Sequence, residues 1–492
     1  MRSVTRSSTS DRPRSLMPAV PSDPPRILSR ADSEAMFKRV VALAASGGDT
    51  QVTIRSTWIA NLRWARNRPT TSGDTVEQMA VITRFLNGAS LTAQLDRLDD
   101  ATLKEAMRLL EQRLAGATPD SDDPLPDPLG KQEYLTPTIW NDATYKMTPR
   151  DLSDSARKSV DPVAEAKLVA AGYVEIGAMS WAIFNTRGLD AYSAATGALY
   201  TETVRISDGT GSGWAGKSHV DWSKLDAPAL SAAALQKCRD SANPFKIEPG
   251  RYTTVLEAKA AGLLMASAVR EMNRKDAEED TNNPYNLSKG KSKIGTRIFD
   301  SRITVTSDPT DPECGYIPFD SEGNPHHKVN WIENGVLKEL PYNRRYARKK
   351  LGTDVALPNP QAFTVSGGDT SLEEMVKSTE RGIYVTHFGE LSPEDGKSLN
   401  MTGTTRDGLW LIEHGKIVHP IKNLWINDSP LIVFNQVQQL GRPVRTVGVY
   451  WEGFGGVERD LPTQVLNAGN TPVVSPPMKV TDFNFTRLID AI

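Results

Sequence analysis

The chain has 492 residues, of which 38% are hydrophobic and 24% are charged. At roughly 100–200 residues per domain, this length predicts two to four domains and excludes a single small module. The 58 Lys and Arg residues nearly balance the 60 Asp and Glu residues, so the formal net charge is only −2. Because such a balance gives no overall positive field, we expect no direct nucleic-acid partner and no membrane surface.

The cysteine count and the apolar runs favour a cytoplasmic protein. Cys238 and Cys314 are the only cysteines, so the sequence has neither a disulfide framework nor a CxxC motif. No apolar run reaches the ~18 residues that a membrane helix needs. Residues 1–30 are rich in Ser, Arg and Pro and lack the apolar core of a secretory signal, so we expect a flexible tail.

Residues 31–118 predict a small N-terminal α+β domain. A first amphipathic helix begins at a cap provided by Asp32 or Ser33. Several short segments rich in β-branched residues then predict a meander, with Asn87-Gly88 as a hairpin turn. A second helix follows an Asp99 or Asp100 cap, with apolar residues at helical spacing at Leu103, Met107, Leu110 and Leu114.

The composition changes twice after this domain. Repeated X-Pro pairs and acidic residues over 119–150 predict a linker. From 151 to 492, short apolar segments alternate with Gly, Asn and Pro turns and with a few helical patterns. This pattern predicts a larger β-rich, barrel-like domain, and the fold class of the whole chain is therefore α+β.

The glycine-rich stretch 211–218 matches the GxxxxGK[ST] pattern of a phosphate-binding loop. A working loop of this kind opens directly into a helix whose N-terminus faces the phosphate. Here HVDWSKLDAP separates Lys217 from the next helical start. We therefore expect a flexible surface loop, and a nucleotide-binding protein is a remote alternative that an extended Lys217 would exclude.

The histidines and acidic residues show no ligand spacing. None of the six histidines forms an HxH, HxxH or HExxH pattern; they are His219, His326, His327, His387, His414 and His419. The last two flank a predicted hairpin and are expected to face solvent. The acidic run from Asp276 to Asp280 is expected to form a solvated helix end.

A helix over 256–275 carries a broad apolar stripe, which predicts core packing against a sheet. The stripe consists of Ala261, Leu264, Met265, Ala268, Val269 and Met272.

From about Met36 to the end, the order of sequence blocks resembles the TldD/PmbA (TldD/TldE) family, labelled modulators of DNA gyrase. The blocks include GYVEIGAMSWAIFNTRGLDAYSAATG, YTTVLEAKAAGLLMASAVREM, KIGTRIFDSRITVTSDPT, WIENGVLKELPYNRRYAR, RGIYVTHFGELSPEDG and DGLWLIEHGKIVHPIKNLWIN. The resemblance implies a soluble two-domain architecture. In such pairs a TldD-type subunit carries zinc on an HExxxH helix and cleaves peptides, and a TldE-type partner lacks the ligands and completes an enclosing dimer.

The resemblance also places the family's zinc helix on GLLMASAVREM. Ala266 then stands at the first His, Ser267 at the Glu base and Glu271 at the second His. The Cys ligand expected near the C-terminus is also missing, because residues 445–477 contain no Cys. A catalytic zinc needs about three protein ligands and a base that accepts a proton. We therefore expect a metal-free, TldE-like chain without catalytic residues or a cofactor of its own.

The resemblance leads to a hypothesis about partners. We expect a non-catalytic subunit that pairs with a TldD-like zinc protease and helps to bind unfolded peptides. An extended peptide can add to a sheet edge, and we place that edge at Ile383, Tyr384, Val385, Thr386 and His387. The alternative is an enzyme with a relocated active site around Glu271, Ser267 and the lone histidines. Two or more of Glu271, His387, His414 and His419 within hydrogen-bond reach in a pocket would favour it.

Overall fold

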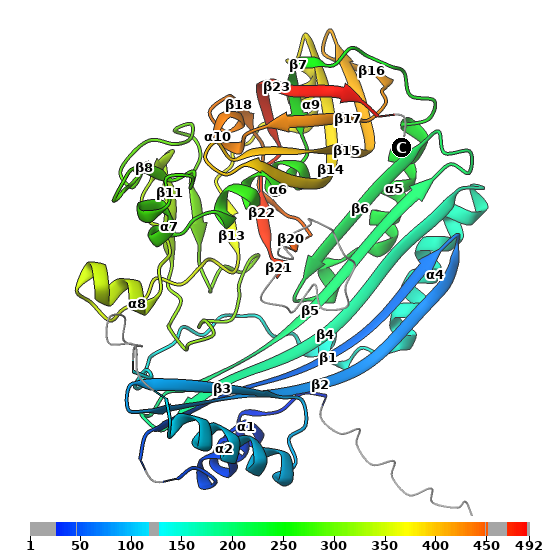
Figure 1. Cartoon of the computed structure of the whole chain (residues 1–492). Helices are drawn as coiled ribbons and strands as arrows, with labels where there is room; N and C mark the ends of the chain where they lie inside the picture. Colours follow the sequence, from blue (N-terminus) through cyan, green and yellow to red (C-terminus); the bar gives the residue numbers. More distant parts are fainter. Residues whose placement is uncertain (1–25, 46, 118–126, 448, 451–469, 490–492) are drawn as a thin grey trace, which may run out of the picture.

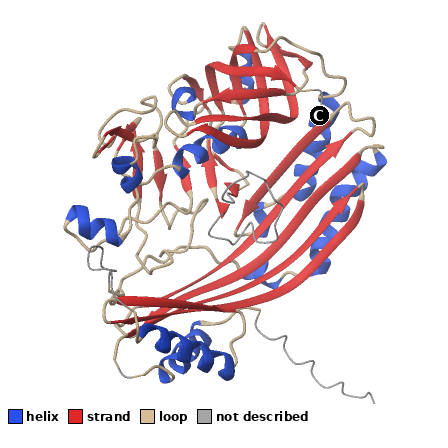
Figure 2. Ribbon diagram, viewed as in Figure 1, coloured by secondary structure: helices blue, strands red, loops and turns tan. Residues whose placement is uncertain are grey.

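The structure is a computed structural model that describes residues 26–45, 47–117, 127–447, 449–450 and 470–489. A long curved sheet runs along one side of the molecule, and a barrel and a smaller sheet lie beside it (Figures 1 and 2). Helices and strands both contribute throughout, which confirms the α+β class and the β-rich, barrel-like region.

The long sheet has the strand order β3-β2-β1-β4-β5-β6, and all neighbouring strands are antiparallel. Its strands are β1 (Asp49–Ala65), β2 (Arg68–Leu86), β3 (Ala89–Leu95), β4 (Val169–Asn185), β5 (Asp190–Arg205) and β6 (Ser212–His219). The Asn87-Gly88 turn between β2 and β3 is confirmed, since both residues have positive φ, at 51° and 78°.

The predicted short strands of the meander are in fact longer. β1 continues through 17 residues, and the chain turns at Arg66 and Asn67, with φ of 51° and 61°. Trp58, in the middle of this strand, is buried, and its indole Nε1 donates to Asp74 Oδ1 on β2 at 2.8 Å. Pairing with β2 on one side and β4 on the other stabilises the strand across the positions where turns were expected.

The pairing of β1 with β4 joins distant parts of the chain. It runs from Gln51 opposite Asn185 to Trp64 opposite Gly172. Residues 49–95 and 169–219 therefore share one sheet, and the expected linker at 119–150 does not divide this sheet. Within that stretch, residues 127–141 contain no helix or strand and α3 (Asp142–Lys146) follows.

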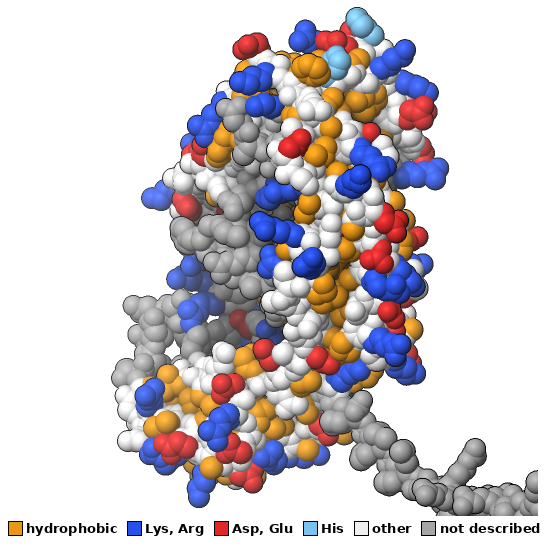
Figure 3. Space-filling model, turned by 90° about the vertical axis from the view of Figure 1, so that its right-hand side faces the viewer, with side chains coloured by type: hydrophobic (Ala, Val, Ile, Leu, Met, Phe, Trp, Pro, Cys, Tyr) orange, Lys and Arg blue, Asp and Glu red, His pale blue; other side chains and the backbone are white. Residues whose placement is uncertain are grey.

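Four helices cover the sheet on the side of the even-numbered residues of β1. Val52 and Ile54 pack in a cluster with α1 (Arg30–Ala42) and α2 (Asp100–Leu114). Trp58 and Trp64 pack in a cluster with α4 (Pro149–Glu165) and α5 (Ala227–Asp240). Basic and acidic side chains are both spread over this side of the molecule (Figure 3).

Side chains that cap the helix ends set their boundaries. Asp99 caps α2 as predicted, because its carboxylate accepts from Thr102 N. The cap of α1 is Ser29 and not Asp32 or Ser33, since Asp32 is the third residue of a capping box and bonds back to Ser29. The predicted cap thus lay one turn inside the helix.

The glycine-rich stretch is strand β6, so the expected flexible loop is wrong. Lys217 is extended and pairs opposite Tyr200 of β5, which also removes the phosphate-loop alternative. The glycines serve packing: a Cβ on Gly213 would lie 2.2 Å from Ala234 O of α5. A Cβ on Gly211 would lie 2.6 Å from Cys238 O of the same helix. The motif therefore reflects close contact between a helix and a strand.

The barrel is a ring of strands in the order β14-β7-β23-β17-β15, and β15 pairs back with β14. The hairpin strand β16 and the short β18 extend it. Its strands are β7 (Gly250–Leu256), β14 (Arg381–Asp395), β15 (Asn400–Glu413), β16 (Lys416–Pro420), β17 (Leu424–Asp428), β18 (Val437–Leu440) and β23 (Met478–Leu488), with the helices α9 (Leu372–Lys377) and α10 (Pro430–Val433) beside it.

A smaller sheet has the order β12-β11-β10-β13-β22-β19. Its strands are β10 (Val305–Ser307), β11 (Val329–Glu333), β12 (Val336–Leu337), β13 (Phe363–Val365), β19 (Val444–Arg445) and β22 (Val473–Ser475). Two short pairs complete the strands: β8 (Asn286–Ser288) with β9 (Lys291–Ser292), and β20 (Val449–Tyr450) with β21 (Asn470–Thr471). The helical segments η1 (Trp222–Lys224), α7 (Arg274–Glu279), α8 (Arg344–Tyr346) and η2 (Ala347–Leu351) are short.

Helix α6 (Ala258–Arg270) lies between the barrel and the smaller sheet and contacts β14 and β22. Helix α6 ends before residue 275, where the sequence predicted its end, because Glu271 is its C-cap and Asn273 is the N-cap of α7. The predicted apolar stripe is buried, and most of the remaining surface of the helix is buried as well. The helix is thus central to the largest apolar core.

We predict that Gly213→Ala destabilises the contact between β6 and α5. The added methyl cannot avoid the backbone oxygen of Ala234, so we expect a loss of about 1–3 kcal/mol in the free energy of unfolding. Gly116→Ala is the control, since a Cβ there meets no atom within 4 Å. Urea denaturation of both variants measures the difference, and equal stability would contradict the packing role of the glycine.

Glu202 is a buried carboxyl between the sheet and its helices. It accepts from Trp64 Nε1 at 3.2 Å and from the Tyr200 hydroxyl at 3.1 Å. Burial raises the pKa of this carboxyl above its ordinary value, although these hydrogen bonds and one from Ser231 oppose the shift. The folded state therefore keeps a proton at pH values where the unfolded carboxyl has already lost it.

We predict that the free energy of unfolding falls as pH rises from the unfolded pKa of about 4.5 through the folded pKa of Glu202. Glu202→Gln removes this contribution and gives a smaller loss of stability between pH 4 and pH 8. The exposed Glu77→Gln serves as control. Urea midpoints across this pH range test the prediction, and parallel curves for wild type and Glu202→Gln would refute it.

Candidate functional site

The three positions aligned with a zinc motif lie at the C-terminal end of α6. Ala266 is buried and Glu271 is half-buried as the C-cap of the helix. The Ser267 hydroxyl donates to Leu263 O of its own helix at 3.1 Å. The carboxylate of Glu271 lies 3.6 Å from Arg270 Nε. The hydroxyl and the carboxylate thus have partners within the helix and its end.

A cavity of about 290 Å³ opens at this end of the helix, and we call it the α6 cavity. Apolar side chains from α6 and β13 form part of its wall, and polar side chains from the α6–α7 connection and nearby loops form the rest. Its lining residues are Ala266, Val269, Arg270, Glu271, Met272, Asn273, Asp276, Asn283, Asn359, Pro360 and Phe363. The sequence placed Ala266 and Glu271 at one site, and the structure brings both to this cavity.

The side chains of Tyr285 and Asn283 donate hydrogen bonds to backbone carbonyls at the C-terminal end of α6. The Tyr285 hydroxyl donates to Ala268 O at 2.7 Å, and Asn283 Nδ2 donates to Glu271 O at 3.3 Å. Tyr285 is fully buried, and burial together with the nearby Glu271 carboxylate raises the pKa of its phenol. A neutral phenol is therefore a permanent donor here. The sequence analysis did not identify Tyr285, because Ala268 and Tyr285 are 17 residues apart and no local sequence pattern predicts their hydrogen bond.

These residues do not fit a catalytic zinc. Ala266 has no lone pair, and among the described residues there is no group of three or more His, Cys, Asp or Glu that could hold a metal. Cys314 is buried and its Sγ donates to Phe363 O at 3.5 Å, and burial raises the pKa of the thiol to about 12. The Cys-free stretch 445–477 lies largely outside the described residues.

The histidines do not gather around Glu271. His414, on the β15–β16 turn, pairs with Glu380, and His419 packs edge-on against Phe245 with ring centroids 4.7 Å apart. Both are exposed, as the sequence predicted. His387 instead lies beside Asp407 and stacks on Trp214. The contacts found in the described part of the chain therefore give no support to the relocated site.

Two further histidines are buried within the protein. Burial lowers the pKa of His219, and its Nδ1 accepts from Asp221 N at 2.9 Å. Burial lowers the pKa of His326 to about 4, and its Nε2 lies 3.1 Å from Gln361 Nε2. Both imidazoles are neutral at physiological pH and have structural roles.

Ser212, Asp407 and His387 form a polar cluster between β6 and the barrel. The Ser212 hydroxyl donates to Asp407 Oδ1, and His387 Nδ1 lies 3.4 Å from Asp407 Oδ2. Burial alone would raise the pKa of Asp407, but the interactions with His387 and Ser212 hold it below its ordinary value. The carboxylate stands between the hydroxyl and the imidazole. A serine nucleophile needs the imidazole in that place, so this cluster is not a catalytic triad.

The expected peptide-binding edge is an interior strand. β14 pairs with β7 from Gly382 to Val385 and with β15 along its other side. Ile383 and Val385 are fully buried, and Thr386 and His387 are also buried. Because both edges of Ile383, Tyr384 and Val385 are occupied, no peptide strand can add there. The sequence pattern showed a strand but could not show its neighbours.

The acidic run at α7 is more structured than expected. Glu278 lies 3.2 Å from Arg274 Nε and also accepts from the Tyr346 hydroxyl, and Glu279 lies 3.6 Å from Lys350. Asp276 and Asp280 are exposed. Part of this helix end is therefore anchored by ion pairs, and only part is solvated.

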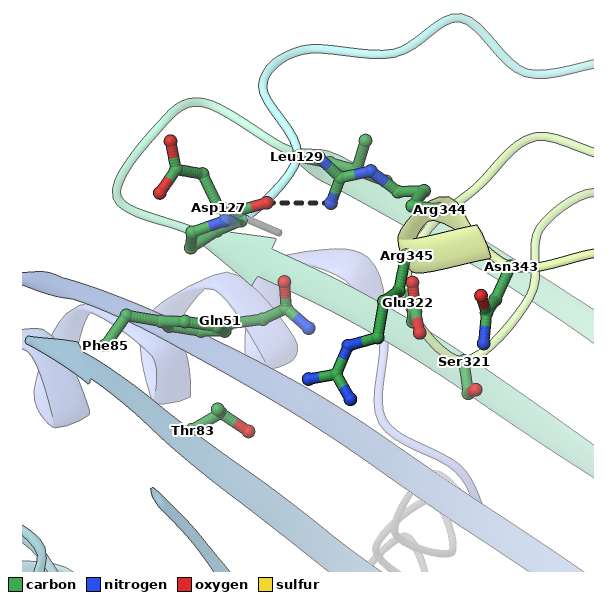
Figure 4. Close-up of a pocket in the computed structure, with 11 residues that line it drawn as sticks. Gln51, Thr83, Phe85, Asp127, Leu129, Ser321, Glu322, Asn343, Arg344 and Arg345 are labelled. Atoms are coloured by element: carbon green, nitrogen blue, oxygen red, sulfur yellow. Dashed lines mark hydrogen bonds between the residues drawn. The ribbon is translucent and has the colours of Figure 1, made fainter. Parts of the chain in front are cut away.

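A second cavity, of about 420 Å³, lies between the end of the long sheet and α8 (Figure 4). Arg345 extends from α8 toward Gln51 and Thr83 of the sheet (Figure 4). Arg344 Nη1 donates to Asp127 O at 2.7 Å, and its Nη2 lies 2.5 Å from Asp354 Oδ2. Because these contacts join the sheet end, the 127–129 segment and α8, we interpret this cavity as a structural junction.

Comparisons with known proteins agree with this architecture. A family model described as the PmbA/TldA metallopeptidase C-terminal domain matches residues 249–487. Residues 249–487 therefore form a domain of the TldD/PmbA family. A metalloprotease TldD homolog from Buchnera aphidicola is 29% identical over 211 residues, which cover 39% of this chain and 41% of that protein. A metalloprotease from Archaeoglobus fulgidus is 26% identical over 165 residues, or 31% of this chain and 38% of that protein. The alignments thus span about two fifths of these relatives.

Solved structures show that the TldD/PmbA fold extends over most of the chain. A protein from Thermotoga maritima described as a modulator of DNA gyrase has a TM-score of 0.75 at 19% identity, covering 92% of this chain and all of that chain. TldE from Thermococcus kodakarensis has a TM-score of 0.74 at 16% identity, with 92% and 100% coverage. At these identities the likeness concerns the fold. No helix in the described part of the chain is long and apolar enough to cross a membrane.

We predict that Tyr285→Phe lowers the free energy of unfolding by about 1–2 kcal/mol, because Ala268 O would lose its buried donor. Ser267→Ala is the matched control, since its hydroxyl only bonds back to its own helix, and we expect a change within about 0.5 kcal/mol. Chemical denaturation measures both. A Tyr285→Phe variant as stable as wild type would show that the phenol does not hold the helix end.

Proposed function

We propose that this chain is the metal-free, TldE-like subunit of a zinc peptidase complex and that bond cleavage takes place in a TldD-like partner. The observation that carries this proposal is the composition of α6, where Ala266, Ser267 and Glu271 replace two ligands and the base. Hydrolysis by the zinc mechanism needs a Lewis acid and a proton acceptor, and these side chains supply no zinc site.

The packing around α6 supports a structural role for this helix. It contacts both β14 and β22, and a Cβ on Gly262 would lie 3.3 Å from the Ser475 and Val473 side chains. A helix that is buried on nearly all sides keeps its place in the core whether or not it carries a metal. The subunit can therefore retain the family fold after losing the metal site.

In this proposal the chain completes the space in which a cytoplasmic partner cleaves unfolded peptides, and it helps to hold them. The zinc belongs to the partner, which is a TldD-like chain in a heterodimer or a larger assembly. The β14 strand is not the contact surface for the peptide, because its edges are paired. An enzyme with a relocated site around Glu271 and Ser267 is the alternative, and no contact described above favours it.

We predict that the isolated chain binds less than about 0.1 zinc per chain and cleaves no unstructured peptide, because the residues that the structure describes contain no ligand set. Co-expression with an HExxxH homologue is expected to give a stable complex with about one zinc per HExxxH chain and peptide cleavage. Elemental analysis of the purified proteins and cleavage of a casein-derived peptide measure both quantities.

Two control variants separate the proposal from its alternative. Replacing the motif Glu of the partner by Gln should abolish cleavage, whereas Ser267→Ala in this chain should leave it unchanged. Stoichiometric zinc in the isolated chain, or cleavage that depends on Ser267, would overturn the assignment.

A further inference from the structure

We propose that the α6 cavity binds the side chain of a lysine or arginine in an extended peptide. This inference rests on the proposed function only for the peptide character of the ligand. The choice of a basic side chain comes from the shape and the charge of the cavity itself.

The apolar part of the cavity suits a long aliphatic stem. Ala266, Met272 and Phe363 line it and are at most 3% exposed, so they form a fixed wall within the core. A volume of about 290 Å³ accepts one long side chain and part of its backbone. Lysine and arginine bury their methylene groups along such surfaces and keep the charged group at the polar end.

Position 266 explains why this space exists. Ala266 lines the cavity with a single methyl group, whereas a larger side chain there would project into it. The residue that removes a metal ligand from the helix therefore also opens room for a ligand of a different kind.

The polar part of the cavity has an excess of negative charge. Glu271 and Asp276 contribute two carboxylates and Arg270 contributes one guanidinium, which gives a net charge of −1 for the lining side chains. Arg270 lies 3.6 Å from Glu271. Among the described residues, no ion pair involves the Asp276 carboxylate. A cation that enters the cavity therefore gains an attractive carboxylate, and an anion meets repulsion.

Neighbouring polar groups anchor the backbone at Glu271 and Asp276. Asn273 Oδ1 accepts from Asp276 N at 3.1 Å and so fixes the start of α7. Asn283 ties the Glu271 backbone to the loop before Tyr285. Because the backbone at both carboxylates is anchored, the cavity is organised before a ligand arrives, and little ordering cost accompanies binding.

The test uses the full-length chain and three fluorescent peptides of about twelve residues with the same unstructured sequence. One carries a central lysine, one carries norleucine, which has a similar length without the charge, and one carries glutamate. Fluorescence anisotropy gives the three dissociation constants. We expect the lysine peptide to bind about fivefold more tightly than the norleucine peptide, and the glutamate peptide to bind most weakly.

Variants assign this preference to the cavity. Asp276→Asn should remove most of the difference between the lysine and norleucine peptides, while norleucine binding stays unchanged. Ala266→Leu, which fills the apolar part, should weaken both peptides. Glu279→Gln is the matched control, because Glu279 lies on the same short helix but does not line the cavity. Unchanged thermal midpoints establish that the variants are folded.

The outcomes distinguish this inference from the proposed function. Equal binding of the lysine and norleucine peptides, a preference that survives Asp276→Asn, or no saturable binding of the lysine peptide would overturn the inference. Partner-dependent cleavage could still occur in each of these cases, and the proposed function would then stand. If the isolated chain contains zinc and cleaves peptides, the proposed function fails, whatever the peptide preference.

Discussion

The pairing of β1 with β4 is the constraint on which the rest of the structure depends. It connects the N-terminal meander to the later strands β5 and β6, and the resulting sheet carries one apolar cluster with α1 and α2 and a second with α4 and α5. Without this pairing, the inner edge of the meander would be unpaired and Trp64 would lose its contact with Glu202 of β5. Helix α5 packs on β6, and the Ser212 backbone N–H donates to the Ser241 hydroxyl. Both β6 and α5 also contact β15, so this part of the sheet lies against the barrel.

Away from the long sheet, α6 packs between the barrel and the smaller sheet. Most of its surface is buried in the largest apolar core. The helix is held by apolar contacts and by the Tyr285 hydroxyl, neither of which involves a metal. The polar groups that remain around Glu271 and Asp276 then define what the site can recognise.

Much of the local structure could be predicted from the sequence. The Asp99 cap, the Asn87-Gly88 turn and the buried stripe of α6 follow from rules that relate residues only a few positions apart. The α+β class and the family also followed from patterns in the chain. The choice of Ala266, Ser267 and Glu271 came from the family resemblance, and two of them, Ala266 and Glu271, line the α6 cavity.

The predictions that failed concern distant neighbours. Periodicity identified a strand at Ile383 to Val385 but could not reveal that β7 lies on one side and β15 on the other. The glycines at 211 and 213 led us to expect a flexible surface loop, because the helix that requires them lies more than twenty residues further along the chain. Tyr285 and Asn283 contact the end of α6, and no rule based on residue spacing predicts these contacts from a single sequence.

The barrel has its first and last strands as neighbours, since β7 begins at Gly250 and pairs with β23, which ends at Leu488. The ring therefore cannot close until residues 478–488 have left the ribosome. Until that moment β7 has only β14 beside it, and the interior face of the nascent barrel is open. A premature stop codon that removes only the last strand would leave the ring unclosed, and such a product would be a substrate for chaperones and quality-control proteases.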